Sequence, residues 1–199
     1  MTGLARAHRI LLGAVAVVAA VLAVTGVWLT FTYRPSAAQA WTDLDIAPAG
    51  TDWPRLIHQV ATALLVLLVI ALLVVGVVAT RRWRSATALL VTTIALAYTG
   101  LLLPWDQVAL WAVTVGTNYQ GMLSAAFSDD VRFVLIRGVE ISQGTLRLWF
   151  LVHAVALALI FFSLLALTAR SAYRRSPAAT SPPPTSGDRW SNQSMTARS

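Results

Sequence analysis

The feature that most constrains this chain is the apolar run from Leu148 to Ala169, whose polar side chains are those of His153, Ser163 and Thr168. About 20 consecutive apolar residues cross the hydrocarbon core of a bilayer as a helix, so the run predicts a transmembrane span. An imidazole inside a span is costly to remove from water and needs a partner within the protein. We therefore expect His153 to face a partner on another helix.

The composition is that of a membrane protein, because 57% of the 199 residues are hydrophobic and only 12% are charged, whereas soluble domains carry about 25% charged residues. We expect four spans, at about residues 10–33, 56–79, 86–103 and 148–169. They form the ordered part of the chain, residues 10–170, between a basic lead at 1–9 and a tail at 171–199. The Pro, Ser and Thr content of the tail predicts disorder. The apolar stretch 108–118 is expected to form a short helix at the membrane interface.

The charges predict the orientation of the chain in the bilayer. If the four helices alternate in direction, one side receives the arginine clusters, at Arg6, Arg9, Arg81, Arg82, Arg84, Arg170, Arg174 and Arg175. The other side receives seven of the eight acidic residues, namely Asp43, Asp45, Asp52, Asp106, Asp129, Asp130 and Glu140. By the positive-inside rule, we expect a multi-pass protein of the cell membrane with both termini cytoplasmic. The net charge of +7 is thus interpreted as topology, and no nucleic-acid partner is expected.

Two histidines are expected at the same depth. His58 follows Pro54 by four residues, which places it roughly 6 Å below the outer end of the second span. His153 lies roughly two turns into the fourth span, counted from the same side. Gly26 and Gly100 fall in this layer on the first and third spans. Glycine costs about 1 kcal/mol relative to alanine within a helix, so both glycines require a packing reason.

A haem held between the helices would account for this layer, because two neutral imidazoles can fill both axial positions of its iron. The chain contains no cysteine, so the haem would be bound without covalent attachment. Arg55 lies one turn before His58 on the same helical face and is a candidate partner for a haem propionate. Arg147 is a weaker candidate, because it is rotated away from the face of His153.

Each residue of this layer also has a simpler interpretation. An intramembrane histidine can hydrogen-bond across helices without binding metal, and glycines alone can serve close helix packing. His8 falls outside the expected spans and is interpreted as an exposed residue of the basic lead. Asp129 and Asp130 are interpreted as a solvated pair in a loop. Agreement in depth between His58 and His153 is what favours the haem.

The stretch TGLLLPWDQVALWAVTVGTN, residues 99–118, closely resembles the end of the third helix and the following loop in the cytochrome b and cytochrome b6 family. Three further matches follow the family's order: TGVWLTFTYRPS with Gly26, R-x-x-H at Arg55 and His58, and GTLRLWFLVH ending at His153. The resemblance covers roughly residues 10–170. It implies an all-α, up-and-down, four-helix haem-binding bundle.

The resemblance also implies a departure from the family pattern. In the family a second haem lies deeper, held by histidines fourteen residues beyond the first pair; these positions are Leu72 and Leu167 here. The matching glycine positions, fourteen residues before Gly26 and Gly100, are Leu12 and Ala86. We therefore expect one haem b, the outer, lower-potential one of the family. Two local departures are Leu157, where the family has proline, and an arginine near His153 displaced by one position.

We expect a b-type cytochrome that transfers single electrons near the outer face of the membrane, as a subunit of a quinol-linked respiratory complex rather than a stand-alone enzyme. Its axial ligands would be His58 and His153. The family's C-terminal helices, with the P-E-W-Y motif, have no counterpart here, so a quinone site would require a separate redox subunit, such as a Rieske-type protein or a C-terminal cytochrome b subunit. The alternatives are a haem-free membrane scaffold and a haem-free quinone-binding protein that uses the loop 105–118.

Overall fold

The computed structural model describes residues 3–45, 52–80, 83–117, 134–137 and 140–173, and over these residues the chain is helical without strands. The elements, in order, are α1 (Gly3–Thr32), α2 (Ala40–Asp45), α3 (Trp53–Val75), the π-helical turn η1 (Gly76–Thr80), α4 (Trp83–Leu102), α5 (Gln107–Thr117), α7 (Gln143–Leu151), the π-helical turn η2 (Val152–Leu157) and α8 (Ala158–Tyr173).

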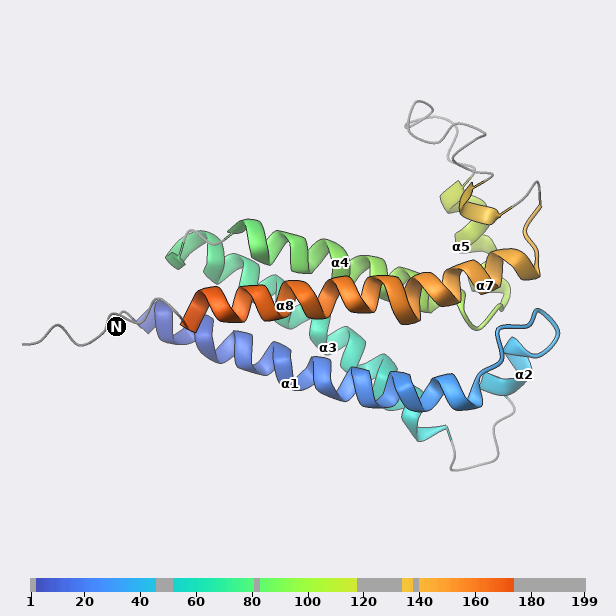
Figure 1. The fold of residues 1–199 in the computed structure, drawn as a ribbon, viewed down its shortest axis with the longest axis horizontal. Helices are drawn as coiled ribbons and strands as arrows, with labels where there is room; N and C mark the ends of the chain where they lie inside the picture. The colour runs from blue at the N-terminus through green and yellow to red at the C-terminus, as the bar shows by residue number, and fades with distance from the viewer. Residues whose placement is uncertain (1–2, 46–51, 81–82, 118–133, 138–139, 174–199) are drawn as a thin grey trace, which may run out of the picture. The chain divides into compact units, whose positions relative to one another are not determined.

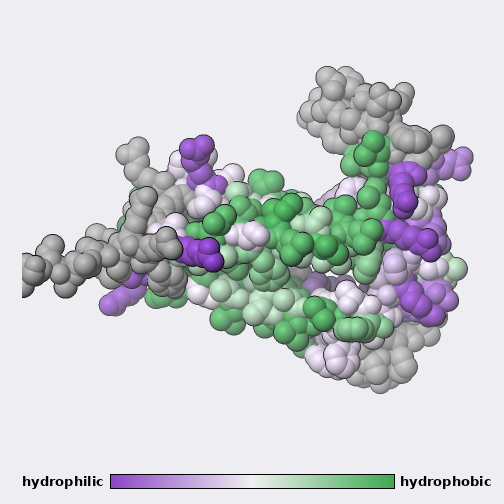
Figure 2. Space-filling model, viewed as in Figure 1, coloured by the Kyte–Doolittle hydropathy of each residue, from purple (hydrophilic) through white to green (hydrophobic). Residues whose placement is uncertain are grey.

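Four helical stretches of the described chain are long and apolar enough to cross a membrane: Gly3–Thr32, Trp53–Val78, Trp83–Leu102 and Gln143–Ala172. The last is continuous through α7, η2 and α8. Consecutive stretches run in opposite directions (Figure 1). Hydrophobic residues gather over the middle of these helices and hydrophilic residues over their two ends (Figure 2). The predicted all-α bundle of four transmembrane helices is thus confirmed.

The first helix begins at Gly3, and this corrects the interpretation of His8 as an exposed residue. His8 is only 3% exposed. No proline interrupts the segment between Gly3 and Ile10, so the helix extends through the basic lead. His8 then falls in a buried stripe with Leu12, Val15 and Ala19, which follow at helical spacing.

Polar contacts order the connections at the end of the bundle where α1 and α4 finish. Trp105 adopts a positive φ of 58°, a conformation that is strained for an aromatic residue, and so turns the chain sharply after α4. The carboxylate of Asp106 then accepts a hydrogen bond from the backbone N–H of Ala109 at 2.7 Å, which caps α5. At the start of α7, Ser142 and Thr145 form a reciprocal capping box.

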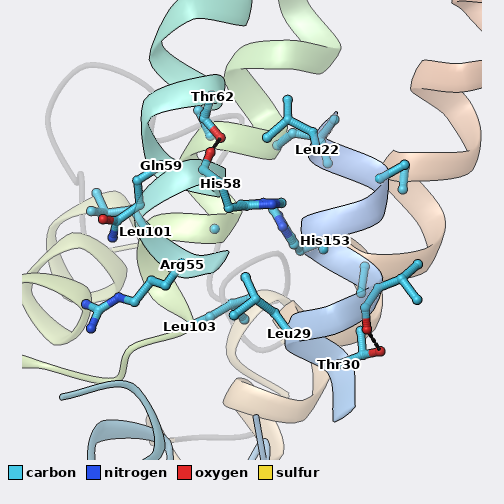
Figure 3. Close-up of a pocket in the computed structure, with 18 of the residues that line it drawn as sticks. Leu22, Leu29, Thr30, Arg55, His58, Gln59, Thr62, Leu101, Leu103 and His153 are labelled. Carbon is cyan, nitrogen blue, oxygen red and sulfur yellow. Dashed lines mark hydrogen bonds between the residues drawn. The ribbon is translucent and has the colours of Figure 1, made fainter. Parts of the chain in front are cut away.

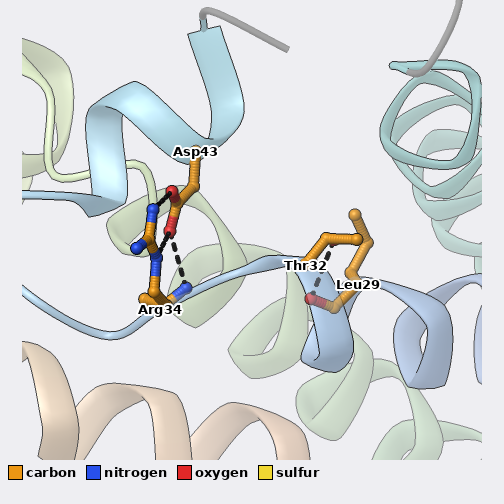
Figure 4. Close-up of polar contacts among 4 residues, drawn as sticks. All are labelled: Leu29, Thr32, Arg34 and Asp43. Atoms are coloured by element: carbon orange, nitrogen blue, oxygen red, sulfur yellow. Dashed lines mark hydrogen bonds and ion pairs between the residues drawn. The ribbon is translucent and has the colours of Figure 1, made fainter. Parts of the chain in front are cut away.

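The connection between α1 and α2 is closed by an ion pair. The guanidinium of Arg34 contacts both carboxylate oxygens of Asp43, at 2.5 and 3.0 Å, and the backbone N–H of Arg34 donates to the same carboxylate at 2.9 Å (Figure 4). The hydrogen bond from Arg34 holds the pKa of Asp43 below its ordinary value, so the pair persists at neutral pH. It fixes α2 beside the end of α1.

Helix α5 packs one side on the bundle and exposes the other. Val113 is buried with Leu102 and Ile136, whereas Val108, Trp111 and Val115 are 50–65% exposed. The apolar exposed side fits the predicted interfacial location, which remains a prediction.

Some of the predictions concern residues outside the described ranges. These are the tail beyond residue 173, the arginines at 81, 82, 174 and 175, and the acids at 129 and 130.

Candidate functional site

A cavity of about 450 Å³ opens between the helices in the half of the bundle where α1 and α4 end. This volume falls in the range of about 300–1,000 Å³ that is typical of cofactor sites. All four spans contribute to its lining, which is mostly apolar and includes Leu22, Leu65, Leu96 and Phe161. The cavity brings together four of the residues that the sequence singled out: Gly26, His58, Gly100 and His153.

His58 on α3 and His153 in η2 point toward one another in the cavity (Figure 3). Their ring centroids lie 6.4 Å apart, and the ring planes cross at 62°. With a metal–nitrogen bond of about 2.0 Å and a ring nitrogen about 1.1 Å from the ring centre, two imidazoles on opposite sides of one metal ion have centroids roughly 6.2 Å apart. The crossing angle is compatible with this arrangement, because rotating a ring about the metal–nitrogen axis leaves the bond unchanged.

The two glycines of this layer lie against the two imidazoles. A Cβ atom placed on Gly26 would lie 3.3 Å from Cε1 of His58, and one on Gly100 would lie 3.0 Å from Cε1 of His153. Such contacts are shorter than ordinary carbon–carbon packing distances of about 3.5–4.0 Å. Any side chain at Gly100 would therefore press on the ring of His153. This contact gives both glycines the packing reason that their cost in a helix requires.

A threonine hydroxyl lies beside each of the two imidazoles, and the sequence analysis did not predict either contact. The hydroxyl of Thr25 lies 2.9 Å from Nδ1 of His58, and that of Thr99 lies 3.0 Å from Nδ1 of His153. Each threonine directly precedes one of the glycines. The dipeptide Thr-Gly, repeated near the same end of the first and third spans, is the sequence signal that points to them.

The mouth of the cavity is more polar. Arg55 lines it, and its guanidinium donates to the backbone carbonyl of Leu44 in α2. Tyr33, another lining residue that the sequence did not single out, donates its hydroxyl to the carbonyl of Leu103 at 2.6 Å. Burial, with the nearby charge of Asp43, raises the pKa of Tyr33, so the phenol remains a donor. Arg147 does not line the cavity; its guanidinium lies 3.0 Å from the side-chain amide of Gln143.

The other half of the bundle is packed with side chains. Leu12, Leu72 and Ala86 are each at most 2% exposed, and none of them lines the cavity. Leu167, the fourth-span position that corresponds to an inner-haem ligand of the family, is 60% exposed. The wide turn η2 takes up more residues per turn than an α-helix, so the buried position is Thr168, which is 3% exposed and donates to the carbonyl of Leu164.

The donor set fits a haem better than a metal ion held by protein alone. Among the described residues, no three His, Cys, Asp or Glu side chains come together to hold a metal. Two imidazoles alone leave most of a metal's coordination positions unfilled, whereas a porphyrin supplies the equatorial nitrogens itself.

Comparison with known proteins points to one family. The family model described as cytochrome b/b6/petB matches residues 7–170. Cytochrome b6 of Porphyra purpurea is 30% identical over 146 residues, which are 68% of this chain and 67% of that protein. Cytochrome b6 of Pyropia yezoensis is 31% identical over the same length, and that of Chlamydomonas reinhardtii is 29% identical.

A solved structure titled "Hyperthermophilic respiratory Complex III" contains a chain with a similar fold, with a TM-score of 0.67 and 24% identity. The match covers 79% of this chain and 45% of that chain, so this protein spans less than half of that larger one. The match to the family model extends over nearly all of the helical bundle, including both histidines. The chain is therefore a multi-pass membrane protein that belongs to the cytochrome b/b6 family.

Proposed function

We propose that this chain is a membrane b-type cytochrome that transfers single electrons through one non-covalent haem b, with His58 and His153 as its axial ligands. The observation that carries the proposal is the pair of imidazoles, 6.4 Å apart between centroids, that face each other inside an apolar cavity. The family implies haem binding, and the two glycines leave room for the imidazoles of His58 and His153.

When bound, the haem supplies a one-electron couple at its iron. The residues around the haem would determine which reactions its iron cannot carry out. If His58 and His153 held the iron of this group, no iron position would remain for oxygen or substrate. The apolar lining formed by residues such as Leu22, Leu96 and Phe161 keeps water from the ligands. The site is thus suited to electron transfer without chemistry on a bound substrate.

The packed half of the bundle supports a single haem. A second haem would have to displace Leu12, Leu72 and Ala86, which are all buried. In addition, Leu72 and Leu167, which correspond to the inner ligands of the family, offer no imidazole, and neither does the buried Thr168. Electrons would then enter and leave the haem on the same side of the membrane, which the charge distribution predicts to be the outer side of the cell membrane, with both termini cytoplasmic.

We assign the chain to a quinol-linked respiratory complex as an electron-transfer subunit. The similar chain of the respiratory complex III structure is more than twice as long as the part matched here. A partner redox subunit, such as a Rieske-type protein or a C-terminal cytochrome b subunit, would supply a quinone site. This assignment rests on the family and on the resemblance in fold.

The direct test of haem binding is the reduced-minus-oxidised absorption spectrum of the full chain purified in detergent. A b-type band is expected. A chain that is folded by circular dichroism but colourless after expression with added haem precursor would instead support the rival function, a haem-free scaffold. If quinone co-purified with that colourless chain, the quinone-binding function would be favoured.

Arg55 is proposed as the partner of a haem propionate, because it is the arginine that lines the mouth of the cavity. Replacing it with leucine is expected to weaken haem binding without removing the band, since it takes away one charge-assisted contact of about 1.5–3 kcal/mol. The measurement is the transfer of haem from the purified variant to apomyoglobin. Arg84→Gln, at the opposite end of the bundle, is the control, and equal transfer rates in the two variants would contradict the role of Arg55.

A further inference from the structure

The hydroxyls of Thr25 and Thr99 make two kinds of contact each. Thr25 Oγ1 lies 2.9 Å from the carbonyl of Val21 and 3.3 Å from that of Leu22, besides its contact with His58. Thr99 Oγ1 lies 2.8 Å from the carbonyl of Ala95 and 3.1 Å from that of Leu96, besides its contact with His153. The two arrangements repeat each other on α1 and α4.

The direction of these hydrogen bonds follows from counting protons. A threonine hydroxyl carries one proton, and a carbonyl oxygen can only accept. If the hydroxyl donated to Nδ1 of the imidazole, the oxygen–oxygen contacts with two backbone carbonyls would be left without a proton between them. If the hydroxyl donates to its own helix, its lone pair accepts a proton from Nδ1–H of the histidine. Only the second arrangement places a proton both between the hydroxyl and its own helix and between the hydroxyl and the imidazole.

The consequence concerns the other ring nitrogen. A neutral imidazole carries one N–H, so a proton held on Nδ1 leaves Nε2 with a bare lone pair. A bare Nε2 is the form that binds a metal, and ligating histidines usually donate their other N–H to an acceptor of the protein. Each imidazole also contacts a backbone carbonyl of the same helix as the threonine beside it, that of Leu22 for His58 and that of Leu96 for His153, which can only accept. The hydroxyls and these carbonyls together select the tautomer that can bind iron, and the hydroxyls hold each ring in place.

We propose that Thr25 and Thr99 are positioning residues that fix the Nδ1–H tautomer and the orientation of His58 and His153 for axial ligation. The inference rests on the proposed haem function and adds to it the hydrogen-bond acceptors of both ligands. It also implies that the two ligands are held equivalently, each by a Thr-Gly pair on the neighbouring helix.

The hydrogen bond from Nδ1–H also makes the imidazole a stronger electron donor. A stronger donor favours the oxidised iron, so the intact hydrogen bonds keep the midpoint potential low. Valine has the shape of threonine without the acceptor. Thr25→Val and Thr99→Val are therefore expected to raise the midpoint potential and to weaken haem binding by about 10- to 100-fold.

The test compares the midpoint potential and the rate of haem loss in the purified full chain and its variants. Thr92→Val is the matched control: Thr92 is also buried on α4 and donates to the carbonyl four residues earlier, at 2.8 Å, but does not line the cavity. Thr25→Ser and Thr99→Ser keep the hydroxyl and are expected to restore both values. Potentials of Thr25→Val and Thr99→Val equal to that of Thr92→Val would overturn the inference.

A second measurement does not depend on variants that bind haem. In the reduced wild-type protein, low-spin iron is diamagnetic, and ¹H–¹⁵N spectra with labelled histidine should show a slowly exchanging Nδ1–H for both ligands. A haem-containing protein without these signals would overturn the inference and leave the proposed function standing. A folded wild-type chain without haem would overturn the proposed function, and the inference with it.

Discussion

Replacing His153 with alanine is expected to abolish the b-type absorption band of the purified protein. The substitution removes one axial ligand from a site where the structure offers no replacement within the cavity: the other lining residues are apolar side chains, hydroxyls, one amide and Arg55, besides His58. A haem held by His58 alone would also lose the contact that would fix it between α3 and η2. His58→Ala is expected to have the same effect, because the two half-sites are built alike. The measurement is the reduced-minus-oxidised spectrum, normalised to protein.

His8 provides the control for these variants, since it is the remaining histidine of the chain and does not line the cavity. His8→Gln is expected to keep the band. Because His8 is buried, folding of all three variants should be compared by circular dichroism before the spectra are interpreted. A full-intensity band in either His58→Ala or His153→Ala would show that the residue is not an axial ligand.

Replacing Gly100 with leucine is expected to eliminate haem binding while leaving the helices formed. A Cβ alone would lie 3.0 Å from Cε1 of His153, and the further atoms of leucine would occupy the space beside the ring. Overpacking of this kind typically costs about 1–3 kcal/mol, and here it falls on a metal ligand. Gly100→Ala is expected to be intermediate, because the ring must move by only a few tenths of an ångström.

The glycines also provide a graded series with an internal control. Gly26→Ala should lose less haem than Gly100→Ala, since its Cβ would lie 3.3 Å from His58. Around Gly13 nothing lies within 4 Å of an added Cβ, so Gly13→Ala should keep the full haem content, with up to about 1 kcal/mol of added helix stability. Haem content measured by absorbance should decrease from Gly13→Ala to Gly26→Ala and again to Gly100→Ala. An equal effect at all three positions would contradict the contact with the histidines.

The four spans and the shared layer of His58 and His153 could be predicted from the sequence because both follow from simple regularities. Long apolar runs leave few alternatives to transmembrane helices, and the rise of an α-helix converts sequence spacing into depth. The glycines were found by the same counting. The hydroxyl partners were not, because a threonine in an apolar helix most often bonds to its own backbone, as Thr92 does here.

Two further features of the structure were not predicted, and each has a local cause. His8 was placed outside the bundle because hydropathy marks where apolar residues begin, whereas the helix itself extends back to Gly3 through a polar lead. The fourteen-residue spacing of the family leads from His153 to Leu167, which is 60% exposed. The π-helical turn η2, which contains that histidine, shifts the register so that the neighbouring Thr168 is the buried residue. Such a turn has no hydropathy signature, since the residues within it are ordinary apolar ones.

The number of haems per chain tests the central claim most directly, because it depends on both halves of the bundle. The pyridine haemochrome assay on the purified wild-type chain, with protein measured by amino-acid analysis, should give one haem b per chain. A value near two would show that the half packed by Leu12, Leu72 and Ala86 also opens to bind haem. A value near zero for the folded chain would contradict the assignment of His58 and His153 as ligands.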